Sequence, residues 1–123
     1  MKTLRKTIFI LAVLFSFSMS GQTISHIEQS GSWYRIYDQN GKSTRSLSTS
    51  NGELVGYSSS MFILRSGSWY YIYSPDGKRE RSMSVSTVGE ILNVAGDTFT
   101  SRSGSWIYTW NRDGKKVNTR SAH

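Results

Sequence analysis

The sequence predicts an all-β protein made of three antiparallel repeats, each of 36–37 residues and four short strands. The tetrapeptide Ser-Gly-Ser-Trp recurs at residues 30–33, 66–69 and 103–106, and a Gly-Lys turn follows each copy at a similar distance. No segment after residue 21 has a convincing helical pattern of apolar residues. The repeat cores are assigned to residues 30–65, 66–102 and 103–123, the last of which stops short of a full repeat, within one domain that spans residues 22–123, with one inserted residue near Thr87.

The first 21 residues predict a signal peptide. Three basic residues precede an apolar run at residues 8–17, and small residues follow it. The run is about half of the roughly 20 residues that a bilayer-spanning helix needs, so an N-terminal membrane anchor is the less favoured alternative. The chain is therefore expected to be exported to the periplasm, the cell surface or the medium, with membrane contact only through the export signal.

Composition narrows the class of partner. The chain has no cysteine, which excludes disulfides and an acylated lipoprotein cysteine. Of the 15 basic residues three lie in the leader, which leaves 12 against 8 acidic ones and a net charge of +4. Those 12 fall mostly near predicted turns rather than in one stripe, so a solvated rim is expected and a nucleic-acid partner is not.

Each repeat is predicted to contain an aromatic strand followed by a tight turn. Asp38, Ser74 and Asn111 take the first position of that turn, where their side chains can cap the backbone. The turn glycines Gly41, Gly77 and Gly114 are expected to have positive φ, as in a type I turn with a glycine bulge. Further turns are predicted at each Ser-Gly, at residues 51–52, at residues 58–60 and at residues 95–97.

Alternation along the aromatic strands predicts which side chains pack between repeats. Both faces of these strands are largely apolar, which indicates cover on both sides. The predicted repeat core is Trp33, Trp69, Trp106, Tyr37, Tyr73 and Trp110. Three other aromatic residues are the candidate exposed, ligand-binding side chains: Tyr34, Tyr57 and Tyr70.

The aromatic strand that runs into Asp-Gly-Lys resembles a β-propeller blade, and the repeat as a whole weakly resembles the WG-type repeats. Here Trp-Tyr or Trp-Ile stands where a WG repeat has Trp-Gly. The resemblance implies four-stranded blades, but a closed propeller usually needs at least four of them. Three arrangements stay open: a six-blade ring made by a homodimer, a β-trefoil, or an open twisted meander.

Few residues suit catalysis. The two histidines are His26 and His123, and neither forms a zinc-binding pattern. Glu53 and Glu90 recur at one repeat position and could in principle form a carboxylate pair for glycoside chemistry. A repeated surface residue explains them more simply, so no catalytic residue, metal or cofactor is expected.

The sequence therefore predicts an exported, non-catalytic β-repeat protein that binds an unknown protein or glycan. A lectin-like carbohydrate-binding protein is one alternative, because fucose lectins of the propeller class have similar Tyr-x-x-x-Gly-Lys hairpins. The chain lacks their further Trp-Asp-Gly segments. A structural, self-assembling envelope protein is the other alternative.

Overall fold

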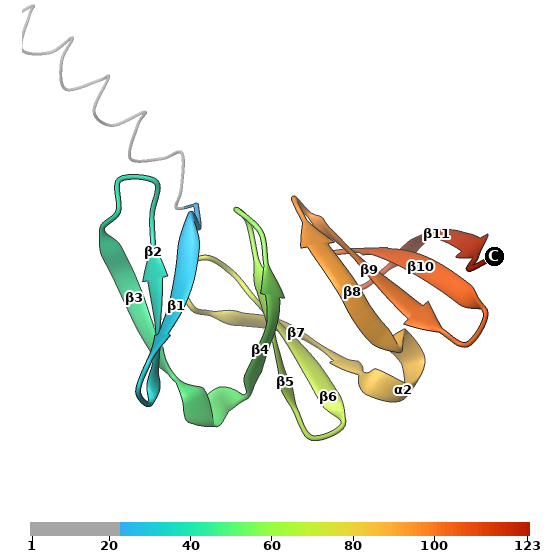
Figure 1. The fold of residues 1–123 in the computed structure, drawn as a ribbon, viewed down its shortest axis with the longest axis horizontal. Helices are drawn as coiled ribbons and strands as arrows, with labels where there is room; N and C mark the ends of the chain where they lie inside the picture. Colours follow the sequence, from blue (N-terminus) through green and yellow to red (C-terminus); the bar gives the residue numbers. More distant parts are fainter. Residues whose placement is uncertain (1–22) are drawn as a thin grey trace, which may run out of the picture.

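The computed structural model describes residues 23–123, so the predicted signal peptide lies outside the described residues. Figure 1 shows three antiparallel β-sheets placed one after another along the chain. The first sheet has three strands: β1 (His26–Ser30), β2 (Trp33–Tyr37) and β3 (Ser43–Ser48). The second has four: β4 (Glu53–Tyr57), β5 (Phe62–Ser66), β6 (Trp69–Tyr73) and β7 (Arg79–Ser84). The third has β8 (Glu90–Ala95), β9 (Thr98–Ser103), β10 (Trp106–Asn111) and β11 (Lys116–Ser121).

Every sheet is a meander in which each strand pairs with the next strand along the chain. The all-β prediction is thus confirmed, and four strands per unit is confirmed for the second and third sheets. The sheets do not begin where the sequence repeats begin. The second and third sheets start at β4 and β8, whereas the predicted repeats start at Ser66 and Ser103, within the sheets. Within residues 23–123 the sheets close into neither a barrel nor a propeller.

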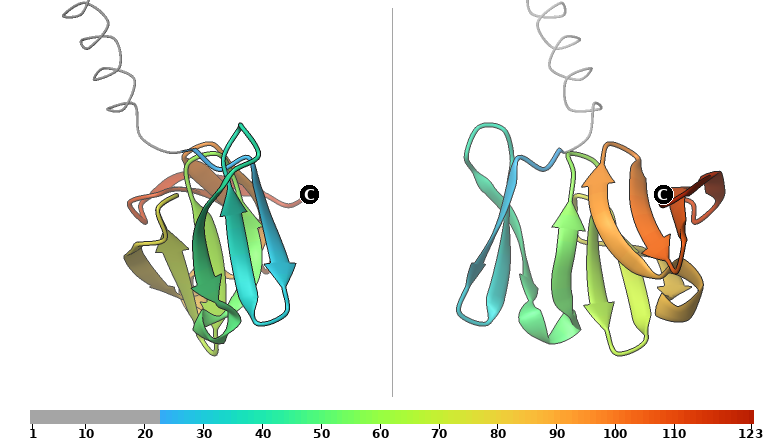
Figure 2. Two further views of the ribbon diagram at one scale, coloured as in Figure 1. Left: turned by 90° about the vertical axis from the view of Figure 1, so that its left-hand side faces the viewer. Right: turned by 45° about the vertical axis from the view of Figure 1, so that its right-hand side comes forward.

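The three sheets pack face to face in a row, as the two views of Figure 2 show. An apolar layer fills each of the two spaces between them. The layer between the first and second sheets consists of Ile24, Ile27, Tyr34, Ile36, Phe62, Leu64 and Tyr73. The layer between the second and third sheets consists of Met61, Ile63, Tyr70, Ile72, Val88, Phe99 and Trp110. Only the second sheet contributes to both layers, because it alone has apolar side chains on both faces.

Most of the side chains on the two outward faces of the row are polar. On the third sheet Thr98, Thr100 and Thr109 are partly exposed, and they replace Met61, Ile63 and Ile72 of the second sheet, which are fully buried. On the first sheet, the outward positions equivalent to Phe62, Leu64 and Tyr71 carry exposed His26, Glu28 and Arg35. The row therefore ends in a polar face at each side, as end repeats of stacked arrays do.

Two short helical turns connect the sheets. The 3-10 turn η1 (Thr49–Asn51) leads into β4, and the α-helical turn α2 (Val85–Val88) leads into β8. Ser48 and Ser84 cap them, since each hydroxyl accepts a hydrogen bond from the amide two residues ahead. Helical structure was not predicted here. The fourth residue of α2 is the insertion that sequence alignment placed near Thr87.

The predicted Gly-Lys turns are confirmed. Gly41, Gly77 and Gly114 have φ of 78°, 84° and 83°. The Asp38 carboxylate accepts hydrogen bonds from the amides of Asn40 and Lys42, and the Asn111 side chain makes the same pair of contacts in the third sheet. At the second turn the Ser74 hydroxyl donates to the Asp76 carboxylate, which lowers the pKa of that carboxyl.

Tyr34 and Tyr70 join neighbouring sheets and are not exposed. The prediction that they are exposed is wrong: their exposed fractions are 4% and 3%. Tyr34 Oη donates to the Gly52 carbonyl at 2.7 Å and accepts from the Leu54 amide at 3.1 Å. Tyr70 Oη donates to the Gly89 carbonyl at 2.7 Å. Each tyrosine thus fastens the first strand of the following sheet, and we call these contacts the tyrosine latches. Tyr57, the third predicted binding residue, is half-buried against the first apolar layer.

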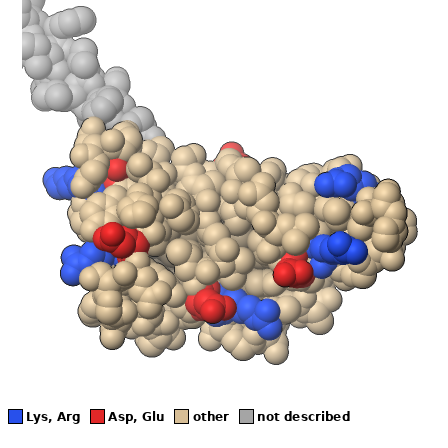
Figure 3. Space-filling model, viewed as in Figure 1, with Lys and Arg blue, Asp and Glu red and all other residues tan. Residues whose placement is uncertain are grey.

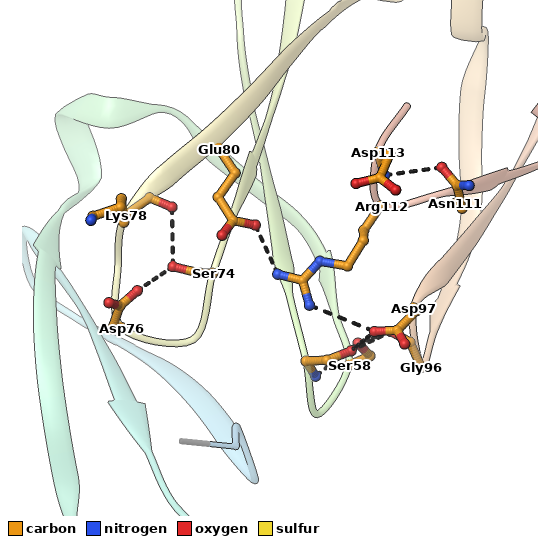
Figure 4. Close-up of polar contacts among 11 residues, drawn as sticks. Ser58, Ser74, Asp76, Lys78, Glu80, Gly96, Asp97, Asn111, Arg112 and Asp113 are labelled. Carbon is orange, nitrogen blue, oxygen red and sulfur yellow. Dashed lines mark hydrogen bonds and ion pairs between the residues drawn. The ribbon is translucent and has the colours of Figure 1, made fainter. Parts of the chain in front are cut away.

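A polar cluster joins the second and third sheets near the ends of β4 and β8, whereas the tyrosine latches lie where these strands begin (Figure 4). Arg112 Nη2 lies 2.8 Å from Glu80 Oε1, and its Nη1 lies 3.6 Å from Asp97 Oδ1. The hydroxyls of Ser58 and Ser60 donate to the Gly96 carbonyl. The pKa of Arg112 is raised by Glu80 above all and also by Asp97, which favours the charged guanidinium.

We expect Tyr70→Phe to lower the free energy of unfolding by about 1–2 kcal/mol, because it leaves the Gly89 carbonyl without its donor in a partly buried position. Tyr34→Phe should cost at least as much, since it removes two hydrogen bonds. Urea titration of the purified protein measures both. Tyr71→Phe is the matched control, because Tyr71 is partly exposed and takes part in neither latch; an equal loss there would contradict the role given to the latches.

We expect Gly89→Ala to destabilise the protein more than Gly104→Ala. Both glycines have positive φ, which costs an alanine about 1–2 kcal/mol. A methyl group at Gly104 meets no atom within 4 Å, but at Gly89 it lies 2.3 Å from the Arg102 carbonyl oxygen. Forcing the backbone apart adds about 1–3 kcal/mol. Equal melting temperatures for the two variants would show that the approach of α2 to β9 is not tight.

Candidate functional site: a row of exposed tryptophans

Trp33, Trp69 and Trp106 are the largest exposed apolar side chains among residues 23–123. Their exposed fractions are 48%, 47% and 49%, so the prediction that they form the repeat core is wrong. The same prediction is confirmed for Tyr73 and Trp110, at 3% and 5%, while Tyr37 is half-buried on the outward face of the first sheet. The same repeat position therefore carries a solvent-exposed indole in each of the three sheets.

The tryptophans are exposed because of their place in the strand. Each is the first residue of its strand, directly after a two-residue turn. On the face that carries Trp69, the apolar layer is filled by Tyr73, four residues further along the strand, and on the face that carries Trp106 it is filled by Trp110. Across the strands the nearest neighbours of Trp69 are Ser66 and Ser84, which are too small to cover an indole.

The turn that carries each tryptophan is built the same way in every sheet. Gly31, Gly67 and Gly104 have φ of 61°, 63° and 62°, and the serine that follows has negative φ. Glycine at the first central position is typical of a type II′ hairpin turn. The carbonyl of that serine then accepts an amide hydrogen bond from the chain that leaves the sheet, for example Val85 N to Ser68 O at 2.9 Å. Three equivalent indoles are therefore held on three hairpins of the same turn geometry.

Each indole is flanked by two serines on its own face of the sheet. The directly opposite residues are Ser30 and Ser48 for Trp33, Ser66 and Ser84 for Trp69, and Ser103 and Ser121 for Trp106. We call each such group a Ser-Trp-Ser triplet. In the first two triplets one hydroxyl caps the adjoining helical turn and contacts a second hydroxyl, at 2.8 Å between Ser48 and Ser50 and 2.7 Å between Ser84 and Ser86. An apolar plane bordered by hydroxyls can bind a ligand that is itself apolar on one side and polar at its rim.

The tryptophan hairpins also share one end of the molecule. In Figure 1 the β1–β2 and β5–β6 hairpins lie along the lower edge, and the β9–β10 hairpin continues that edge at the right. The three hairpins that carry the triplets therefore lie along one edge of the molecule. We call the three tryptophans that begin their second strands, Trp33, Trp69 and Trp106, the indole row.

The residues considered for catalysis do not form a site. Glu53 and Glu90 are exposed, and each begins the first strand of a different sheet. Each lies directly across from an arginine, Arg65 and Arg102 respectively, which explains a repeated glutamate without catalysis. His26 lies 5.7 Å from Tyr37, ring centre to ring centre, on the outward face of the first sheet. Among residues 23–123 there is no group of three or more side chains that could bind a metal ion.

Charged side chains are dispersed on the face seen in Figure 3, where separate basic and acidic spots alternate over an otherwise uncharged surface. Several basic groups are used within the fold: the Arg79 guanidinium lies 4.0 Å from the Tyr71 ring centre, and Lys116 Nζ lies 3.8 Å from that of Tyr108. In the part of the chain that the structure describes, no helix is long and apolar enough to cross a membrane.

Comparison with known proteins does not place the chain in a family. No protein-family model matches it, and a search of curated proteins finds no match. The resemblance to WG-type repeats therefore stays a resemblance.

The residues around each tryptophan carry a sequence signal for its exposure. Serines precede each tryptophan by one and by three residues, which does not favour a packed core, because a buried serine hydroxyl needs a partner. Buried Trp110 illustrates the contrast, since its Nε1 donates to Ser101 Oγ at 2.9 Å and that hydroxyl donates to the Val88 carbonyl at 2.6 Å.

We expect Trp→Phe at positions 33, 69 or 106 to change the free energy of unfolding by less than about 1 kcal/mol each, because half of the ring is already in solvent. Trp110→Phe should cost about 2 kcal/mol or more, since it removes a buried hydrogen bond and leaves a void. Urea titration gives these values, and iodide quenching of single-tryptophan variants reports exposure directly. A Trp110 quenched as strongly as Trp69 would contradict the assignment.

Proposed function

We propose that this protein is an exported, non-catalytic binding module and that the indole row is its contact surface. The observation that carries the proposal is the equal exposure, 47–49%, of one tryptophan per sheet. Leaving an indole in water is unfavourable, and a fold that buries Trp110 at 5% has the means to bury others. Tryptophan is also the residue most enriched among the dominant contacts of binding surfaces.

The triplet geometry favours a carbohydrate ligand. A pyranose ring has an apolar face that can stack on an indole and hydroxyls at its rim that can bond to the flanking serines. Three equivalent sites on one rigid row suit a polymer with repeated sugars, because occupation of one site raises the effective concentration at the next. This supports the lectin-like version of the function over an enzyme, for which Glu53 and Glu90 offer no shared cleft.

Each sheet is, we infer, equivalent to a propeller blade, although three of them form an open row. The blade-like features are the four-stranded meander, the face-to-face packing and the innermost strands β4 and β8, which approach so closely that a methyl group on Gly56 would lie 2.9 Å from Val94 Cγ2. Pairing of two chains into a six-blade ring requires the outward faces to meet. Glu28, Arg35, Asn118 and Arg120 on those faces do not favour such a self-assembling role.

The test is binding of soluble polysaccharides of different backbone, followed by tryptophan fluorescence and calorimetry. We expect a polymer to shift the emission, and Trp69→Ala in the middle of the row to weaken its affinity at least about tenfold through lost multivalency. A short oligosaccharide should lose one of three sites and keep its affinity at the other two.

Tyr71→Ala is the matched control, because it removes a partly exposed aromatic side chain of β6 that is not part of a triplet. If Trp69→Ala and Tyr71→Ala weaken binding equally, or if no polysaccharide moves the fluorescence, a carbohydrate function of the indole row is refuted.

A further inference from the structure

The first sheet lacks the strand that opens the other two. In the second and third sheets the order is β4-β5-β6-β7 and β8-β9-β10-β11, whereas the first sheet consists of β1-β2-β3. The spacing of 36 residues makes β1 equivalent to β5, not to β4, since His26–Ser30 corresponds to Phe62–Ser66. Among the described residues, β1 is thus an internal strand by sequence position that lies at a sheet edge (Figure 1).

The pairing of β1 also has the form of an internal strand. Six strands of the described sheets are edge strands: β1, β3, β4, β7, β8 and β11. The pairings of the last five all contain a shift of register, a bulge that blunts an edge against further strands. The β1–β2 pairing runs from His26↔Tyr37 to Ser30↔Trp33 without a shift, as do the internal pairings β5–β6 and β9–β10.

The side chains of β1 leave this edge open. Ile27 is buried at 6%, and the other four residues of the strand are exposed. A hairpin with a two-residue turn closes on a hydrogen-bonded pair, here Ser30 and Trp33, so Gln29 and Ile27 are expected to direct their amide and carbonyl groups away from β2. Unlike β3, β7 and β11, the strand carries no lysine or arginine to repel a neighbour.

We propose that an extended segment of a partner polypeptide pairs antiparallel with β1 and completes the first sheet. This is β-strand addition, in which main-chain hydrogen bonds provide affinity and alternate side chains provide specificity. The occupant is defined by the two strands that fill the same place elsewhere in the molecule, β4 beside β5 and β8 beside β9.

The register of β4 on β5 predicts the side chains of the partner. Gly56 lies opposite Ile63, which corresponds to Ile27, and a larger residue than glycine there would meet Val94 of the next sheet. By repeat spacing, Tyr57 is to the first sheet what Val94 is to the second. A large residue of the partner opposite Ile27 would therefore meet Tyr57, so the partner needs a small residue there. In the third sheet, which has no following sheet within residues 23–123, that position is occupied by the larger Asn93.

Two further positions follow from the same register. Val55, the bulge residue of β4, packs into the second apolar layer, so the partner needs an apolar residue just before its small one. Leu54 lies opposite Leu64, the equivalent of Glu28. Because Glu28 is exposed on the outward face, a basic residue opposite it would be favoured. The partner pattern is therefore basic, apolar, small, read towards the carboxyl end.

The probe is a labelled peptide, Gly-Glu-Lys-Val-Gly-Tyr, which is the sequence of residues 52–57 with lysine in place of Leu54. It is titrated by fluorescence anisotropy against the protein purified after export of the full chain. We expect saturable binding, no binding of a scrambled peptide, and at least a tenfold loss when valine in the peptide is replaced by proline. Failure of the intact peptide to bind at millimolar concentration would overturn the proposal.

Two protein variants locate the site. Gln29→Pro removes an amide at the open edge and should weaken peptide binding at least tenfold, whereas Gln29→Ala keeps the amide and should bind as the original chain does. Circular dichroism checks that both are folded. Glu28→Lys should favour a peptide with glutamate in place of lysine, which tests the register independently of any effect on folding.

Other results would refute the proposal. Equal binding to Gln29→Pro and Gln29→Ala would place the peptide elsewhere. Light scattering that shows a dimer dissociated by Gln29→Pro would identify a second copy of this chain as the occupant. Hydrogen exchange that finds the Ile27 amide already protected in the free monomer would show that the chain fills its own edge. None of these results depends on whether the indole row binds carbohydrate.

Discussion

The fold depends on the packing of sheet against sheet, because a single four-stranded sheet cannot enclose a core of its own. Of the three described sheets, only the middle one has both faces buried. Side chains of a single antiparallel meander point alternately to two sides, so an apolar layer forms only where two sheets meet. Phe62 and Leu64 face one neighbour and Ile63 and Ile72 face the other, all at 1% exposure or less. With no disulfide available, these two layers and the tyrosine latches provide the cohesion of the domain.

The three sheets share the same backbone geometry, but the side chains at equivalent positions differ from sheet to sheet. Turn glycines, hairpin geometry and linker hydrogen bonds recur with small differences, whereas the layer residues change with the neighbours that each sheet has. One repeat position, which is occupied by Tyr37, Tyr73 and Trp110, illustrates this difference. The hydroxyl of Tyr37 reaches Glu28 and the indole of Trp110 reaches Ser101, but the equivalent residue near Tyr73 is Leu64, so the Tyr73 hydroxyl is buried without a partner. Among the described side chains it is the one buried polar atom left unpaired, and the stacked Phe62 ring at 4.9 Å compensates part of that loss.

Much of the fold could be predicted from the sequence, because strand and turn preferences are local. The repeat period, the Gly-Lys turns and the inserted residue in α2 all correspond to spacings that are visible in the letters. The roles of the aromatic residues could not be predicted in the same way. Trp33 and Tyr34 are adjacent and both suit a strand, and the alternation rule separates their faces without saying which face has a neighbour. Only the placement of the next sheet decides that Tyr34 meets the Gly52 carbonyl while Trp33 meets solvent. The missing strand of the first sheet could not be predicted either. The Ser-Gly-Ser-Trp motif that defines the sequence repeat lies in the middle of each sheet, so the repeat does not show where a sheet begins.

The asymmetry between the middle sheet and the two outer ones has a consequence for how such a chain can lengthen. A duplicate of residues 52–88 inserted after Val88 would present to each neighbour the same apolar face that the neighbour already contacts, and both polar ends would stay as they are. A copy added at either terminus would instead bring an apolar face against Glu28 or Thr100. Duplication of the central module would therefore keep every apolar face covered, whereas duplication at either end of the row would not.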